Sequence, residues 1–111
     1  MALQLFPEIS KITAVRDGTK YAYIHILATD SKKPTFLLLH GFPSTTYDWR
    51  HVVPLFKELG CGVLAPDLLG YGDSDKPEDV EAYSFKRMAD HIVELVVGEG
   101  LEQVIGVGHD W

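Results

Sequence analysis

The residues with the clearest chemical potential lie at the carboxyl end of the sequence. There an apolar run from Gln103 to Val107 leads into Gly108-His109-Asp110-Trp111. A sharp turn with small residues around it can hold one side chain exposed at the end of a β-strand, and that residue is often a nucleophilic serine. Here the position holds Asp110, and an ionised carboxylate can attack carbon to form an ester. We therefore take Asp110 as a candidate catalytic nucleophile.

Hydrolysis of such an ester places negative charge on a carbonyl oxygen, which needs hydrogen-bond donors nearby. The sequence offers two backbone donors: the N–H of Trp111, next to the nucleophile, and the N–H of Phe42 in the loop His40-Gly41-Phe42-Pro43. Together they would form an oxyanion hole, where loss of one donor typically costs about 3 kcal/mol of transition-state stabilisation. We interpret His40 as a buried polar residue that holds its loop rather than as a base.

Two other kinds of site are disfavoured by the same residues. Gly106-Val107-Gly108 begins like the dinucleotide-binding pattern Gly-x-Gly-x-x-Gly, but Trp111 stands at the third glycine position and is too bulky for close packing of a helix on a strand. No group of His, Asp and Glu residues has the spacing of metal ligands. We therefore expect neither a nucleotide cofactor nor a metal ion.

The framework that must position these residues begins with a predicted β-hairpin. Two β-rich runs, Lys11 to Val15 and Lys20 to Leu27, are joined through Arg16-Asp17-Gly18-Thr19, and Asp-Gly between such runs predicts a primed turn. Alternation in the second run predicts one face made of Tyr21, Tyr23 and His25 and another made of Ala22, Ile24 and Ile26.

Three short apolar runs follow the hairpin, and two helices are predicted between them. The runs Thr35 to Leu39 and Val63 to Ala65 do not alternate, which is typical of parallel strands buried on both faces, and Gln103 to Val107 is the third. The first helix is predicted from Asp48, as its cap, to about Leu59, with Pro54 bending it or marking a later start. The second helix is predicted from the cap Ser84 to about Val97, with an inward stripe of Phe85, Met88, Ile92, Leu95 and Val96.

The order of these elements, a hairpin followed by β-α-β-α-β, predicts an α/β fold whose three later strands are parallel. The carboxyl ends of parallel strands meet at one edge of the sheet. That edge would bring together the loop His40 to Pro43, the Gly- and Asp-rich loop Pro66 to Pro77, and Asp110.

The composition of the chain argues against two classes of binding partner, nucleic acids and membranes. The net charge of −6 argues against a nucleic-acid surface, which requires clustered Lys and Arg. The first residues lack the pattern of a signal peptide, and no apolar run approaches the roughly 18 residues that a membrane span requires. Cys61 is the only cysteine, which favours a reducing compartment. We expect a cytoplasmic protein that binds neither nucleic acid nor membrane.

Taken together, these residues resemble the α/β-hydrolase family and, within it, the epoxide hydrolases. The resemblance covers essentially the whole chain and rests on three segments in the family's order: His40-Gly41-Phe42-Pro43, Asp67 to Ser74, and Gly108-His109-Asp110-Trp111. It implies that Asp110 opens a small-molecule epoxide as the nucleophile, and that Phe42 and Trp111 supply the oxyanion-hole N–H groups. It implies structural roles for His40 and for the Asp67 loop.

Two dehalogenase families resemble parts of the same pattern. Haloalkane dehalogenases share the aspartate turn followed by Trp but usually carry Asn where this sequence has Phe42. Fluoroacetate dehalogenases share the His-Gly-Phe-Pro loop but usually carry Arg where this sequence has Trp111. Both differences favour an epoxide as the substrate, and a haloalkane-dehalogenase-like hydrolase remains the alternative.

The resemblance also predicts parts that these residues do not supply. Residues 1–111 would be the N-terminal portion of a single hydrolase core domain, without the C-terminal half and the cap domain. The family's catalytic His, its supporting acid and two cap tyrosines would follow residue 111. The histidines that come too early in the fold to replace that His are His25, His40, His51 and His91. We expect the C-terminal remainder as a second chain and little activity without it. A non-catalytic fragment or binding module is the alternative if no such chain exists.

Overall fold

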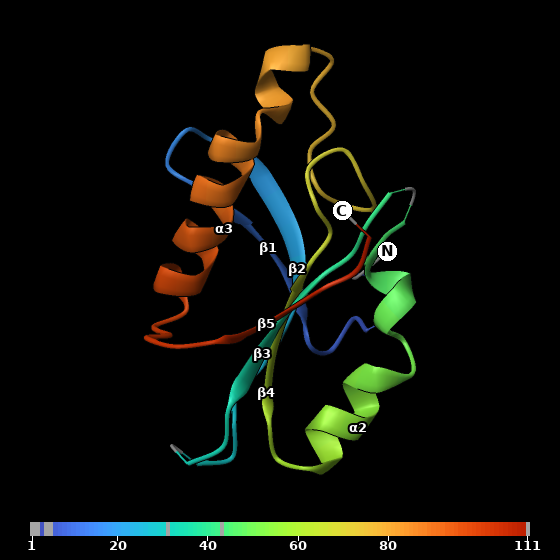
Figure 1. Cartoon of the computed structure of the whole chain (residues 1–111), viewed down its shortest axis with the longest axis vertical. Helices are drawn as coiled ribbons and strands as arrows, with labels where there is room; N and C mark the ends of the chain where they lie inside the picture. Colours follow the sequence, from blue (N-terminus) through green and yellow to red (C-terminus); the bar gives the residue numbers. More distant parts are fainter. Residues whose placement is uncertain (1–2, 4–5, 31, 43, 111) are drawn as a thin grey trace.

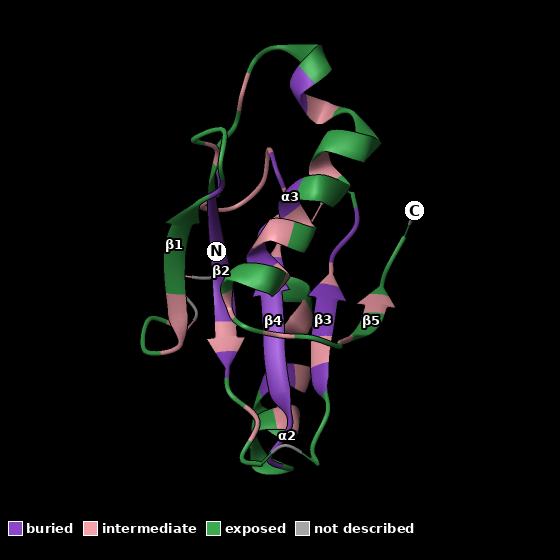
Figure 2. Ribbon diagram, turned by 90° about the vertical axis from the view of Figure 1, so that its left-hand side faces the viewer, coloured by how far each residue is buried: buried purple, intermediate pink, exposed green. Residues whose placement is uncertain are grey.

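A computed structural model describes residues 3, 6–30, 32–42 and 44–110 of the chain. They form a five-stranded mixed sheet with strand order β1-β2-β4-β3-β5 and a helix on each face (Figures 1 and 2). The strands are β1 (Ser10–Ala14), β2 (Lys20–Ile26), β3 (Thr35–Leu39), β4 (Gly62–Pro66) and β5 (Ile105–Gly108). β3 pairs in parallel with both β4 and β5, whereas β2 pairs antiparallel with β1 and β4. The predicted hairpin and parallel unit are therefore confirmed.

The hairpin turn differs from the predicted primed turn. The N–H of Val15 donates to the carbonyl oxygen of Thr19 at 2.9 Å, and the N–H of Gly18 donates to that of Val15 at 2.9 Å. Gly18 has a φ of 90°, but Asp17 is not among the residues with positive φ, which a type I′ turn would require of both central residues. The turn is a three-residue loop in which Gly18 alone takes the left-handed conformation.

The first predicted helix is divided. A 3₁₀ helix, η1 (Thr46–Trp49), is followed by α2 (Val52–Glu58). The prediction of Asp48 as the cap is wrong. The cap is Thr45, three residues earlier, whose hydroxyl accepts the N–H of Tyr47 at 3.1 Å. Pro54 is the third residue of α2, where a helix leaves its N–H groups unpaired, so the late start is confirmed.

The second predicted helix is confirmed as α3 (Phe85–Gly98), which follows a short 3₁₀ helix, η2 (Val80–Tyr83). The hydroxyl of Ser84 accepts the N–H of Arg87 at 3.2 Å, as expected of the cap. The prediction that Phe85 belongs to the buried stripe is wrong, because Phe85 is the first residue of α3 and is 67% exposed. Among the described residues, no helix is both long and apolar enough to cross a membrane.

The alternation of side chains along the strands divides the core between the two faces. The core between the sheet and α2 consists of Ile24, Ile26, Leu38, Val53, Val63 and Ala65. The core between the sheet and α3 consists of Val15, Tyr21, Tyr23, Leu37, Leu64, Leu69 and Leu95. Every residue of β4, at the centre of the sheet, is buried, and β5 at the edge is largely exposed (Figure 2). A strand covered on both faces has no polar side, which explains the uninterrupted apolar runs.

Candidate active site

Asp110 lies two residues beyond β5 in a strained backbone conformation. Its φ of 66° is the only positive φ among the described non-glycine residues. The left-handed region costs a non-glycine residue about 1–3 kcal/mol and persists where the surrounding structure imposes it, often at functional sites. The exposed side chain and this backbone are the features of the sharp turn that the sequence predicts at Asp110.

The loop after β3 approaches this turn so closely that only glycine fits at position 41. A Cβ built on Gly41 would overlap the Cβ of Asp110 and lie 2.5 Å from the carbonyl oxygen of His109. The N–H of His109 also donates to the carbonyl oxygen of Leu39 at 3.1 Å, which continues the β3–β5 pairing up to the turn. The carboxyl ends of β3 and β5 therefore meet, as the parallel arrangement predicts.

The predicted oxyanion-hole donor Phe42 faces Asp110. Its backbone N–H donates to Asp110 Oδ2 at 3.1 Å, although the two residues are 68 positions apart in the sequence. This bond distinguishes the two carboxylate oxygens, because Oδ2 accepts the N–H of the loop. The second predicted donor, Trp111, lies outside the described residues, as does Pro43 of the same loop.

His40 is buried beneath this loop with both ring nitrogens engaged. Nε2 accepts the N–H of Leu68 at 2.9 Å, and Nδ1 lies 3.0 Å from the carbonyl oxygen of Gly41. The residue is only 2% exposed, and burial lowers the pKa of its imidazole below the ordinary value of 6.5. A neutral ring bonded on both sides supports the interpretation of His40 as a residue that holds its loop.

The lowered pKa of His40 predicts acid sensitivity. The unfolded chain takes up a proton near the ordinary pKa of 6.5 while the folded chain does not, so the free energy of unfolding should fall as the pH drops below about 6.5. Burial also lowers the pKa of His25, which adds a contribution of the same sign. Urea unfolding at about pH 7.5 and about pH 5.5 measures this loss. The loss should be smaller in His40→Gln, and an equal loss in both proteins would contradict the assignment.

Asp67, at the end of β4, is a buried carboxylate that organises the neighbouring loops. Its Oδ1 accepts the N–H of Thr46 at 3.0 Å and its Oδ2 accepts the N–H of Asp73 at 3.1 Å. Gly72, with a φ of 53°, packs directly against the carboxylate. Bonds from backbone N–H groups compensate for the burial of the charge. Asp67 thus joins its own loop to η1, a structural position that agrees with the role implied by the resemblance.

A cavity of about 380 Å³ opens beside the turn. Its lining consists of Asp48, Trp49, Val107, Gly108 and His109. In the loop that follows β3, Phe42 is 66% exposed, and its ring lies 6.4 Å, centroid to centroid, from the ring of Tyr71. Aromatic and apolar groups, together with the carboxylate of Asp48, therefore lie on the segments next to the exposed Asp110.

Three further histidines, His25, His51 and His91, lie away from the turn that carries Asp110. His25 lies on the α3 face of the sheet, 3.5 Å from Glu99, and His51 is exposed at the start of α2. His91 is buried in α3, where its Nε2–H donates to Asp17 Oδ2 at 2.9 Å and its Nδ1 lies 2.9 Å from the hydroxyl of Tyr21. The sequence did not predict this Tyr-His-Asp chain, because Tyr21 in β2 and Asp17 in the hairpin turn are 70 and 74 positions from His91 in α3.

The chain from Tyr21 to Asp17 should contribute to stability. Replacing His91 with Leu leaves the fully buried Tyr21 hydroxyl without its partner, and we expect a loss of about 1–3 kcal/mol in the free energy of unfolding. In a double-mutant cycle, adding Tyr21→Phe should cost less in His91→Leu than in the parent protein. The matched control His51→Leu changes an exposed residue and should stay within about 0.5 kcal/mol. Strict additivity would contradict a shared bond.

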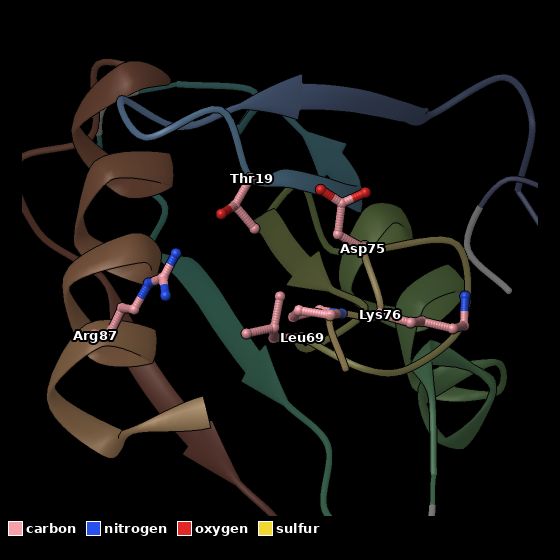
Figure 3. A pocket seen from close by; sticks show the side chains of 6 residues that line it. Thr19, Leu69, Asp75, Lys76 and Arg87 are labelled. Carbon is pink, nitrogen blue, oxygen red and sulfur yellow. The ribbon is translucent and has the colours of Figure 1, made fainter. Parts of the chain in front are cut away.

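A second cavity, of about 300 Å³, is lined by Thr19, Leu69, Asp75, Lys76, Pro77 and Arg87 (Figure 3). Its charged groups are engaged with the protein itself. Arg87 donates to Asp17 at 3.0 Å, and Asp75 accepts the N–H of Lys20 at 2.8 Å. The Lys76 side chain points away from Arg87, and its ammonium donates to the carbonyl oxygen of Gly72 at 2.5 Å. These contacts hold the hairpin, the loop and α3 together, which is a structural function.

Comparison with known proteins agrees with this geometry. The family described as alpha/beta hydrolase fold matches residues 34–111. Epoxide hydrolase A of Mycobacterium tuberculosis is 46% identical over 78 residues, which cover 70% of this chain and 24% of that protein. Epoxide hydrolase 3 of Siraitia grosvenorii is 39% identical over 104 residues, which cover 94% of this chain and 32% of that protein.

Solved structures give the same result. The epoxide hydrolase VrEH1 from Vigna radiata superposes with a TM-score of 0.79 at 35% identity, covering 94% of this chain and 32% of that one. Epoxide hydrolase A from Mycobacterium thermoresistibile superposes with a TM-score of 0.77 at 34% identity, covering 92% and 32%. The chain thus spans about a third or less of the length of the relatives that it matches.

Proposed function

The chain belongs to the α/β-hydrolase fold family, and from that premise we propose that it is the nucleophile-bearing segment of an epoxide hydrolase, which converts an epoxide to a vicinal diol. One observation carries the proposal: Asp110 is an exposed residue on a strained turn after β5, and one oxygen of its carboxylate accepts the N–H of Phe42. The names of the relatives support an epoxide as the substrate.

In the first step, Oδ1 of Asp110 attacks a carbon of the epoxide ring. The bond from that carbon to the ring oxygen breaks, the oxygen takes up a proton, and a hydroxyalkyl ester of Asp110 remains. The proton donors would be contributed by residues beyond this chain. In the second step, a water that has given a proton to a base attacks the carbonyl carbon of the ester, and negative charge develops on Oδ2. When this intermediate collapses, the bond from that carbon to Oδ1 breaks; the diol leaves with Oδ1 and takes up a proton, and the water oxygen remains in the carboxylate of Asp110. The Phe42 N–H, with Trp111 as the second proposed donor, stabilises that charge until the diol leaves.

The proposal extends to partners and compartment. The base that activates water, its supporting acid and the cap tyrosines would come from a C-terminal remainder that completes the sheet beside β5. The partner is then this remainder, and the ligand is an uncharged epoxide. The free, buried Cys61 supports a reducing compartment, and we propose the cytoplasm.

The test is the intact mass of the denatured protein after brief exposure to an aryl epoxide, with the C-terminal remainder present. We expect the mass of the epoxide to appear transiently on the polypeptide that contains Asp110, together with diol in solution. A haloalkane dehalogenase would instead release halide from a chloroalkane and form no diol. If the polypeptide never gains mass and neither diol nor halide is released, the protein has a hydrolase fold but no catalytic activity of this kind.

A further inference from the structure

The peptide unit between Gly41 and Phe42 is held from both sides. Its C=O lies 3.0 Å from Nδ1 of His40, and its N–H donates to Asp110 Oδ2 at 3.1 Å. In a trans peptide the C=O and the N–H point in opposite directions and lie in one rigid plane. A group that fixes the direction of the Gly41 carbonyl therefore also fixes the direction of the Phe42 N–H.

The hydrogen-bond partners of His40 determine its tautomer. The backbone N–H of Leu68 can only donate, so Nε2, at 2.9 Å, must carry a lone pair. A neutral imidazole then has its single proton on Nδ1, which donates to the Gly41 carbonyl. The ring is fixed further by an edge-to-face contact with Tyr71, with 5.3 Å between the ring centroids. The orientation of the imidazole is thus set by the chain that follows β4.

We propose that His40 is a positioning residue that aims the Phe42 N–H at Asp110 and acts on only one half of the reaction. The inference rests on the proposed function. During ester formation the carboxylate loses its charge, so a donor on Oδ2 gives no advantage in the transition state. During ester hydrolysis negative charge builds on Oδ2, and a correctly aimed donor is at its most effective. A change in the direction of the Phe42 N–H should therefore lower the rate of ester hydrolysis and leave the rate of ester formation nearly unchanged.

Two substitutions separate the two bonds of His40. In His40→Asn the amide nitrogen stands near the place of Nδ1 and can still donate to the Gly41 carbonyl. In His40→Gln the longer side chain reaches the place of Nε2, so the amide oxygen can still accept from Leu68, but the bond to Gly41 is lost. Both variants change a buried residue, and only one keeps the bond that aims the peptide.

The experiment is single-turnover kinetics in the protein that also carries the C-terminal remainder, with an aryl epoxide, followed by intact mass. We expect ester formation within about threefold of the parent rate in both variants. We expect ester hydrolysis to fall about 10- to 100-fold in His40→Gln, so that ester accumulates, and to be largely retained in His40→Asn. A ring ¹⁵N spectrum of the parent protein should show the proton on Nδ1.

Several results would overturn the inference while leaving the proposed function intact: ester hydrolysis at the parent rate in His40→Gln, equal loss of both steps in both variants, or a ring proton on Nε2. The ¹⁵N spectrum decides even if a variant fails to fold. Absence of any ester in the parent protein would overturn the proposed function, and with it the role assigned to His40.

Discussion

Replacement of Asp110 by Ala should abolish both turnover and the covalent ester, with a loss of about 10⁴-fold or more in kcat. The alanine has no oxygen to attack carbon, so neither step of the reaction can begin at this position. The fold should persist, because Asp110 is exposed and the positive φ, which alanine tolerates somewhat less well than aspartate, affects one residue at the end of the described chain. Diol formation and intact mass measure the two effects, and thermal unfolding checks the fold.

The matched control for Asp110 is Asp90, an exposed carboxylate in α3 that lies outside the cavity beside the turn. Asp90→Ala removes an equal charge away from the turn, and turnover should stay within a few-fold of the parent value. If Asp110→Ala retained substantial turnover or still gained the mass of the epoxide, another residue would have to be the nucleophile.

The second large effect is expected at Gly41, whose importance is steric. A methyl group there would overlap the Cβ of Asp110 and press on the carbonyl oxygen of His109, so the loop and the turn would have to separate. Displacement of a reacting group by about 1 Å can lower the rate about 100-fold, and we expect a loss of that order in Gly41→Ala. Overpacking should also lower the free energy of unfolding by about 1–3 kcal/mol.

Gly98 provides the control for that substitution. It lies in α3 with nothing within 4 Å of a built Cβ, so Gly98→Ala makes the same chemical change where space is open. The change should leave turnover unaltered and raise the free energy of unfolding slightly, by about 0.5–1 kcal/mol, because alanine is the better helix former. Parent-like kinetics in Gly41→Ala would show that the loop and the turn do not need their close contact.

Local patterns predicted most of the fold because the physics behind them is local. Ser84 begins α3 because its hydroxyl bonds an N–H three residues later, and both residues are visible in the sequence. The same rule failed at Asp48, where two capping residues compete and the choice of Thr45 depends on the path of the preceding loop. The Tyr21–His91–Asp17 chain could not be predicted from local patterns, because it forms only once the hairpin and α3 are packed against each other.

The candidate site was predictable where it follows from topology. Parallel strands end at one edge, so the meeting of the Phe42 loop with Asp110 followed from the order of the elements. The two hydrogen bonds of the His40 ring could not be predicted, because both partners are backbone groups whose directions depend on the fold. The oxyanion-hole role of Trp111 stays a prediction.

The two halves of the site follow strands that differ in the hydrogen bonds and burial that the described residues give them. The loop that carries Phe42 leaves β3, which is bonded on both sides, to β4 and to β5. Asp110 follows β5, for which the described residues provide hydrogen bonds from β3 alone and little burial. Strand segments with few buried contacts open first in native-state fluctuations. Within the described residues the donor loop is therefore anchored through a strand that is paired on both sides, whereas the anchoring of Asp110 on the far side of β5 depends on what pairs with that strand.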